Sequence, residues 1–271
     1  MRLAVVTPTL GESRWLAETV ASVATCAPDA MHVLVAPAAA VAPLSEKFPR
    51  TTVLPDPGGG MYAAINAGLV ASAGVWDAFT YINDDDLLLP DFSAVVRAVS
   101  PAARTRAPLI AYGGVRLIDA HGARLGAIPI SPAPRLNRAL YSQRLEPVYQ
   151  HGTVATRAVF ESVGGFDTAF RLCGDSEYLA RACLHGIPFA CATRREVAAF
   201  RLRAGQLTKN RAPMGAERDR VDKKLGLPAP TPRQELRVAR WRFRLANLAI
   251  YAERIRRHGF VTFDGLLERA G

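Results

Sequence analysis

One stretch of the sequence decides the fold and much of the chemistry. Residues 78–91 read Ala-Phe-Thr-Tyr-Ile-Asn-Asp-Asp-Asp-Leu-Leu-Leu-Pro-Asp. The apolar run Ala78–Ile82 is typical of a buried strand, and three consecutive carboxylates, Asp84 to Asp86, follow its end. Adjacent negative charges repel each other, so the cluster favours a cation, and oxygen ligands suit a hard divalent ion such as Mg²⁺ or Mn²⁺. A solvated acidic turn before a helix near Pro90 is the alternative.

The first hundred residues alternate strand-like and helix-like patterns. We expect strands at Leu3–Thr7, Met31–Ala36, Thr51–Leu54 and Ala78–Ile82, and helices at Arg14–Ala24 and Tyr62–Ala73. This alternation indicates parallel β-α-β units, so the predicted fold class is α/β, with a mostly parallel central sheet flanked by helices. Ligands of such sheets bind at the carboxyl ends of the strands, which is where the acidic cluster falls.

The pattern changes after residue 100. We expect a hairpin of Leu109–Leu117 and Leu125–Ile130, helices at Arg157–Val163 and Ser176–His185, a mobile loop and linker over 203–232, and a final helix over Arg233–His258. The predicted domain is 1–225, with a nucleotide-binding half at 1–100 and an acceptor half at 101–225. Residues 226–271 form a linker and a basic amphipathic helix, a C-terminal helical appendage.

Composition and charge narrow the functional classes. Residues 1–100 hold 5 basic and 10 acidic residues, whereas residues 101–271 hold 29 and 14. A basic half suits phosphate-bearing substrates or an anionic membrane, and the chain carries no recognisable nucleic-acid motif, so we expect no nucleic-acid partner. The four cysteines form no Cys-x-x-Cys pair, and the amino terminus lacks a secretory pattern, so we expect a cytoplasmic protein.

Six segments of the sequence, in order, resemble family-2 inverting glycosyltransferases with the GT-A fold. They are Val5–Leu10, Pro55–Gly68, Asn83–Asp86, Gln150–Thr153, Val163–Asp167 and Gly174–Arg181. The resemblance covers about residues 1–210. It implies a nucleotide-diphospho-sugar transferase fold, a nucleotide-sugar donor, and a hydroxyl of a glycan or lipid-linked acceptor. A role in cell-envelope polysaccharide synthesis follows from the same resemblance.

On the donor side, the resemblance makes Asp85 the ligand of Mn²⁺ or Mg²⁺, while Asn83 and Asp84 contact ribose or metal-bound waters. A divalent ion that bridges phosphate oxygens neutralises the leaving diphosphate as a Lewis acid. Arg203 stands where the family often has a histidine, and an arginine clamps phosphate but does not ligate metal. The remaining donor-side residues implied by the resemblance are Thr7, Pro8, Thr9, Asp56 and Asn66.

On the acceptor side, the resemblance makes Asp175 the general base, because an alcohol becomes a good nucleophile only as its proton is removed. A helix N-cap is the alternative interpretation of Asp175. His151, Gly165 and Glu177 are further acceptor-side residues. His151 also suits a purely structural hydrogen-bonding role.

The sequence departs from the family at the end of the second strand. Members usually place an aspartate there that reads the nucleobase, but Val33–Ala40 contains no carboxylate. The alternative function is therefore a degenerate GT-A scaffold that binds nucleotide or a partner enzyme. A sugar-nucleotide pyrophosphorylase would need a Gly-rich basic loop near the amino terminus, which Leu10–Arg14 does not supply.

The final predicted helix carries an apolar stripe and many arginines. The stripe consists of Val238, Trp241, Leu245, Leu248, Ala252 and Ile255. Such a helix suits peripheral contact with the inner face of an anionic membrane. The alternatives are that the stripe docks on the catalytic domain or forms a homodimer.

Overall fold

The computed structural model describes residues 1–203, 206, 211–259 and 265. Its strands are β1 (Leu3–Pro8), β2 (Met31–Ala36), β3 (Thr52–Pro55), β4 (Ala78–Tyr81), β5 (Leu87–Leu88), β6 (Ile110–Ile118), β7 (Arg124–Ile128), β8 (Thr153–Thr156) and β9 (Phe189–Arg201). Its α-helices are α1 (Leu16–Cys26), α2 (Ala38–Lys47), α3 (Met61–Ala71), α4 (Phe92–Arg104), α5 (Asn137–Tyr141), α6 (Arg157–Val163), α7 (Gly174–Leu184), α8 (Arg211–Leu225), α9 (Arg233–Ala246) and α10 (Leu248–His258).

A single mixed sheet organises the chain, in the order β3-β2-β1-β4-β8-β6-β9-β5, with β7 paired to β6. The first four strands in this order are parallel. Strand β8 is antiparallel to both β4 and β6, and β9 is parallel to β6. The expected parallel arrangement therefore holds for the first half, and β1, β4, β6 and β9 all end at the same edge.

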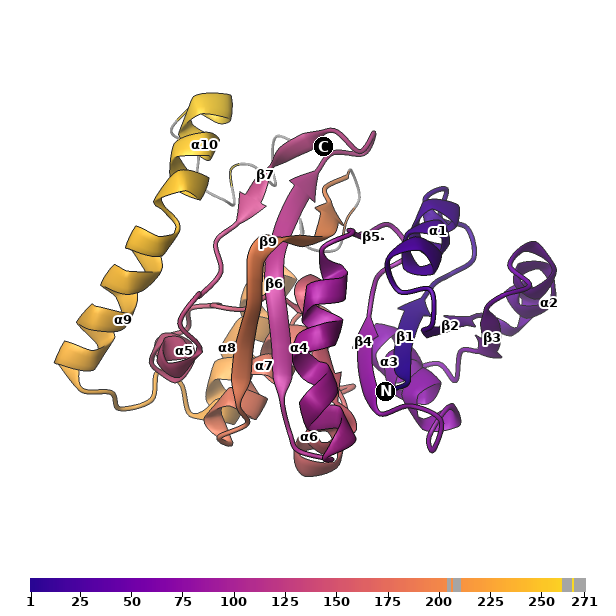
Figure 1. The fold of residues 1–271 in the computed structure, drawn as a ribbon, viewed down its shortest axis with the longest axis horizontal. Coiled ribbons are helices and arrows are strands. Elements are labelled where there is room, and N and C mark those ends of the chain that lie inside the picture. The colour runs from indigo at the N-terminus through magenta and orange to yellow at the C-terminus, as the bar shows by residue number, and fades with distance from the viewer. Residues whose placement is uncertain (204–205, 207–210, 260–264, 266–271) are drawn as a thin grey trace.

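Alternating strand residues supply two cores, one on each face of the sheet. On one face, Val5 and Ile82 pack with Phe92, Val95 and Val99 of α4. The spacing of these α4 residues gives the helix a continuous apolar side. On the other face, α3 and α7 cover Val6, Phe79 and Tyr81. Figure 1 shows α4 in front of the sheet, with α6, α7 and α8 behind it.

The predicted elements of the first half are confirmed to within a few residues, and so are the hairpin of β6 and β7 and helices α6 and α7. The sequence analysis missed α2, α5, β8 and the 13-residue strand β9. It also predicted a mobile loop and linker over 203–232. That interpretation is wrong for 211–225, which form α8, whereas 204–205 and 207–210 lie outside the described residues.

The predicted C-terminal helix is two helices, α9 and α10, which meet at Asn247. Asn247 is buried, and its side-chain amide exchanges hydrogen bonds with the backbone of Ile130 at 3.2 and 2.9 Å. Figure 1 shows both helices along one side of the molecule, beyond α5 and β7. Among the described residues, no helix combines the length and hydrophobicity needed to span a bilayer.

Candidate active site

The three adjacent aspartates at the end of β4 turn to different partners. Asp84 accepts a hydrogen bond of 2.6 Å from the hydroxyl of Thr9, just past β1. Asp85 forms an ion pair of 2.5 Å with Nε of Arg203. Asp86 is fully buried and accepts hydrogen bonds from the backbone N–H of Arg201 and the amide of Asn83. The three carboxylates point in different directions, and of the three it is Asp85 that forms an ion pair with an arginine side chain.

Arg201 lies beside the acidic cluster and was not among the residues expected there from the sequence. It is 1% exposed, donates to the backbone carbonyl of Asp85 at 2.7 Å, and pairs with Glu18 at 2.7 Å. The antiparallel pairing of β5 with β9 brings it beside the cluster, because the chain folds back directly after Asp86. The signal was the alternation of Arg201 and Arg203, which puts both side chains on one face of an extended chain.

Burial and mutual repulsion perturb the aspartates. Burial and the charge of Asp86 raise the pKa of Asp85 to about 6, although Arg203 opposes the shift. Burial also raises the pKa of Asp84, against the effect of the Thr9 hydrogen bond. The cluster therefore holds more negative charge than its surroundings neutralise easily.

Several buried polar atoms beside the cluster have no hydrogen-bond partner among the described residues: Asn83 Oδ1, Gln150 Oε1 and both ring nitrogens of His151. His151 Nε2 lies 3.2 Å from a carboxylate oxygen of Asp86, within ion-pairing distance. Burial opposes protonation of His151, yet the charges of Asp86, Asp175 and Asp85 raise its pKa. Unsatisfied buried groups are rare unless water or a ligand meets them.

Asp175 lies in the first turn of α7, against Tyr62 of α3. The Tyr62 hydroxyl lies 3.1 Å from the Asp175 carboxylate and 3.1 Å from its backbone nitrogen, donating to the first and accepting from the second. Burial, followed by the nearby charge of Glu146, raises the pKa of Asp175. The N-cap alternative is wrong, because Cys173 occupies the cap position and no side chain caps the helix.

The loop before Asp175 is fixed by Glu217 of α8, another residue that the sequence analysis missed. Its carboxylate accepts hydrogen bonds from three consecutive backbone N–H groups, those of Arg171, Leu172 and Cys173, at 2.7 to 3.1 Å. Helix α8 thereby sets the position from which α7 begins. No local sequence pattern marks this contact, since 44 residues separate Glu217 from Cys173.

Other sequence-predicted residues have structural partners. Asn66 exchanges hydrogen bonds of 2.7 and 2.9 Å with the backbone of Phe166. Gly165 makes this approach possible, because a Cβ there would lie 2.6 Å from Asn66 Oδ1. Glu177 is fully buried and pairs with Arg181 and Lys224, which assigns it to the packing of α7 against α8. Donor contact by Asn66 and acceptor contact by Gly165 and Glu177 stay predictions.

The strand ends nearest the amino terminus carry the remaining predicted donor residues. Thr7 is buried, with its hydroxyl 3.0 Å from Nε2 of His32. Pro8 ends β1, and Asp56 follows β3, where its carboxylate accepts from the backbone of Gly58 at 2.8 Å. Strand adjacency brings these residues to the same sheet edge as Asp84, and their contacts with a donor stay predictions.

The residues of the candidate site suit a metal ion that is bound partly by the substrate. Among the described residues, no group of three or more His, Cys, Asp or Glu side chains could enclose a metal ion. Asp85, which pairs with Arg203, is the carboxylate that the family resemblance gives to an ion, and Asn83, two residues earlier, has an amide oxygen without a hydrogen-bond partner among the described residues. Mg²⁺ commonly binds through one or two carboxylates together with waters and substrate phosphates, and such a site needs no protein cage. The donor set fits an ion that arrives with a diphosphate.

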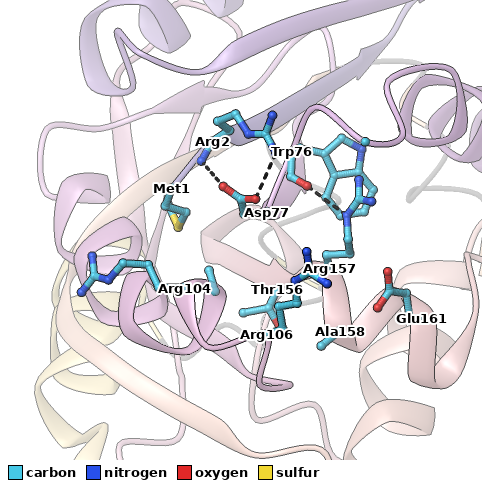
Figure 2. A pocket seen from close by; sticks show the side chains of 12 residues that line it. Met1, Arg2, Trp76, Asp77, Arg104, Arg106, Thr156, Arg157, Ala158 and Glu161 are labelled. Atoms are coloured by element: carbon cyan, nitrogen blue, oxygen red, sulfur yellow. Dashed lines mark hydrogen bonds and ion pairs between the residues drawn. The ribbon is translucent and has the colours of Figure 1, made fainter.

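A hollow of about 460 Å³ lies elsewhere, at the opposite end of the sheet (Figure 2). Its wall includes Trp76, Asp77 and Arg157. The Arg157 guanidinium stacks on Trp76 at 4.3 Å, and Asp77 binds the backbone nitrogen of Arg2 at 2.7 Å. The hollow contains none of the predicted site residues, so its size does not make it the candidate active site.

Comparisons with known proteins place the fold. No family model and no curated protein matches the sequence. Solved structures match in shape: residues 1–349 of S. aureus TarS with UDP-GlcNAc give a TM-score of 0.63 at 15% identity, over 94% of this chain and 79% of that fragment. The mannosyltransferase PcManGT of Pyrobaculum calidifontis, solved with GDP-Man and Mn²⁺, gives 0.57 at 16% identity, over 94% and 73%.

A third similar structure is glucosyl-3-phosphoglycerate synthase from Mycobacterium tuberculosis with UDP, with a TM-score of 0.51 at 17% identity, over 84% of this chain and 81% of that one. Likeness at this level of identity shows the fold. The chain is an α/β protein with the GT-A fold of nucleotide-sugar transferases, as the sequence predicted.

Proposed function

We propose that this chain is a metal-assisted, inverting glycosyltransferase, similar to family 2. It would move a sugar from a nucleotide-diphosphate donor to a hydroxyl of a glycan or lipid-linked acceptor. The observation that carries the proposal is the pair of carboxylates with opposite surroundings in one GT-A fold. Asp85 is ion-paired to an arginine, Asp175 is held by a neutral tyrosine, and His151 feels the charges of both.

On the donor side, Asp85 would hold Mn²⁺ or Mg²⁺, with Asn83 and Asp84 contacting ribose or ordered waters. A bound divalent ion would supply Lewis-acid neutralisation of the diphosphate. Arg203 reaches the same carboxylate and is partly exposed, so its remaining guanidinium N–H groups can bind phosphate oxygens. Arg201 stays buried and keeps the backbone of Asp85 and the carboxylate of Asp86 in place.

On the acceptor side, Asp175 would accept the proton of the acceptor hydroxyl. The freed oxygen would attack the anomeric carbon from the face opposite the diphosphate, and the bond between sugar and diphosphate would break with inversion. Tyr62 orients the carboxylate, and burial raises its basicity. His151 would contact the acceptor or the diphosphate.

The proposed organisation follows from these roles. Residues 1–100 would bind the nucleotide, residues 101–225 would bind the acceptor, and residues 226–271 would form an appendage. A cytoplasmic location, supported by the cysteine pattern, and a part in cell-envelope polysaccharide synthesis, supported by the family resemblance, complete the proposal.

The proposal is tested by donor turnover. Purified protein is incubated with UDP-, GDP- and dTDP-sugars, with Mn²⁺ or with a chelator, and release of the nucleoside diphosphate is followed. We expect release from one donor class, higher with Mn²⁺ and lost in Asp175→Asn when acceptor is present. Nucleotide binding without any turnover across donors and acceptors would instead favour the alternative, a degenerate scaffold.

A further inference from the structure

Helices α9 and α10 expose their large apolar side chains to solvent. Of the nine large apolar side chains that are exposed among the described residues, five lie on these helices: Val238, Trp241, Leu245, Leu248 and Ile255. Trp241 is 64% exposed and Leu248 is 57% exposed. With Ala252 they form the stripe predicted from the sequence, called here the outer stripe. It does not dock on the catalytic domain, which contradicts that alternative.

The helices are held instead by their opposite side, through polar contacts and through an apolar contact of Ala239 and Phe243 with α5. Asn247 binds the backbone of Ile130, Glu253 pairs with Arg124 at 2.9 Å, and Arg194 bonds the carbonyl of Ala246. Ala239 is the only fully buried apolar residue in the described part of α9, where it packs against α5. Because these contacts lie on the opposite side of the helices, the outer stripe stays exposed.

Arginines border the outer stripe. Arg233, Arg237, Arg240 and Arg244 are exposed and recur at helical spacing, so they form one row beside Trp241 and Leu245. Residues 233–258 hold eight arginines and two glutamates, and one of those glutamates, Glu253, already pairs with Arg124 and Arg257. Apolar side chains flanked by cations match a lipid surface, which offers acyl chains below and anionic headgroups above.

We propose that the outer stripe and its arginine row bind the surface of an anionic membrane. A second copy of the chain fits less well, because a two-fold contact through the stripe would bring two arginine rows together with few acids between them. The surface lies apart from Asp85 and Asp175, and its binding is measured without donor or acceptor. Failure of this proposal would therefore leave the proposed transfer untouched.

The test uses the full chain and vesicles, with co-sedimentation as the readout. We expect binding to vesicles of phosphatidylcholine with phosphatidylglycerol, and little binding to phosphatidylcholine alone. Arg237→Gln, Arg240→Gln and Arg244→Gln together should weaken binding roughly a hundredfold, since each basic residue contributes about fivefold near a charged surface. The matched control neutralises Arg50, Arg97 and Arg104, three exposed arginines elsewhere, and should change binding little.

A second pair of variants tests the stripe. Trp241→Ser should weaken binding at least tenfold, whereas Val70→Ser, at an exposed apolar position on α3, should not. Vesicles should also shift the fluorescence of Trp241 to shorter wavelength, a shift that is lost in Trp241→Phe. Equal binding to both vesicle types, equal loss in the two arginine triples, or a dimer that Trp241→Ser converts to monomers would overturn the proposal.

Discussion

Two carboxylates of the candidate site are embedded in opposite ways. Asp85 sits in a run of three acids and meets a cation, Arg203, at 2.5 Å. Asp175 meets a neutral hydroxyl, that of Tyr62, and none of the ion pairs among the described residues includes it. Burial raises the pKa of both carboxylates, but an adjacent cation, Arg203, opposes the rise at Asp85, whereas among the described residues no ion pair opposes it at Asp175. On this difference we propose charge neutralisation for Asp85 and proton transfer for Asp175.

Removing the proton acceptor should have the largest effect. We expect Asp175→Asn to lower transfer by roughly 10²–10⁴-fold, the usual contribution of a general base, with nucleotide affinity unchanged. Single-turnover kinetics and calorimetry measure the two quantities. Asp167→Asn is the control, because Asp167 is a partly exposed carboxylate nearby that pairs with Lys224. Near-normal transfer in Asp175→Asn would reduce Asp175 to a structural residue.

Removing the cation-binding carboxylate should act on binding instead. We expect Asp85→Asn to lose the Mn²⁺-dependent part of nucleotide affinity, roughly 10- to 100-fold, which is the usual weight of a charged contact. The fold should persist, because the substitution relieves repulsion within the cluster. Calorimetry with and without Mn²⁺ measures the effect, with Asp91→Asn, a more exposed acid of the same segment, as control. Unchanged affinity in Mn²⁺ would count against this site.

Two substitutions beside Asp175, at Glu146 and Tyr62, should shift the pH dependence of kcat/KM in opposite directions. Asp175 must be deprotonated to act, so transfer should fall as the pH falls through its raised pKa. Glu146 raises that pKa and the Tyr62 hydroxyl lowers it. Glu146→Gln should therefore move the acid limb of kcat/KM to lower pH, and Tyr62→Phe should move it to higher pH. Limbs that coincide in both variants would show that another group controls the profile.

The smallest expected effect concerns stability rather than activity. Burial lowers the pKa of His32 from 6.5 to about 4. Between pH 6.5 and 4 the unfolded chain binds a proton at His32 and the folded protein does not. The free energy of unfolding is therefore at its full value above pH 6.5 and decreases as the pH falls towards 4. The full loss is about 3 kcal/mol.

Urea unfolding between pH 4 and 7 checks this expectation. The wild type should lose stability on acidification by more than His32→Gln does, and His121→Gln, at an exposed histidine, should follow the wild type. If His32→Gln and the wild type show the same pH dependence, His32 is not the group responsible.

The sequence was most informative where elements form from local patterns. Strands β1, β2 and β4 are apolar runs, and α6 and α7 end near glycines, so their boundaries were predictable. Strand β9 was not, because its sequence is rich in Ala and Arg with strand-forming residues widely spaced, and it depends on pairing with β6. Helix α2 contains Pro43, which argues against a helix, and α8 is polar and is held by the contacts of Glu217 and Lys224.

The same division applies to the site. Asp85 and Asp175 follow from motifs, since each lies within a short segment of recognisable order. Tyr62, Arg201 and Glu217 act on residues at least 44 positions away. Such contacts depend on how helices pack on the sheet, which no local pattern specifies.

We propose that this edge of the sheet binds a nucleoside diphosphate together with a metal ion at Asp85. Asp175 acts as the base and does not contribute to nucleotide binding. A thermal-shift screen of UDP, GDP, dTDP and CMP, each with and without Mn²⁺, tests it on the wild type, Asp85→Asn and Asp175→Asn. We expect one nucleotide to raise the Tm of the wild type and of Asp175→Asn with Mn²⁺, and to have little effect on Asp85→Asn. No shift with any nucleotide, or an equal shift in all three proteins, would contradict the claim.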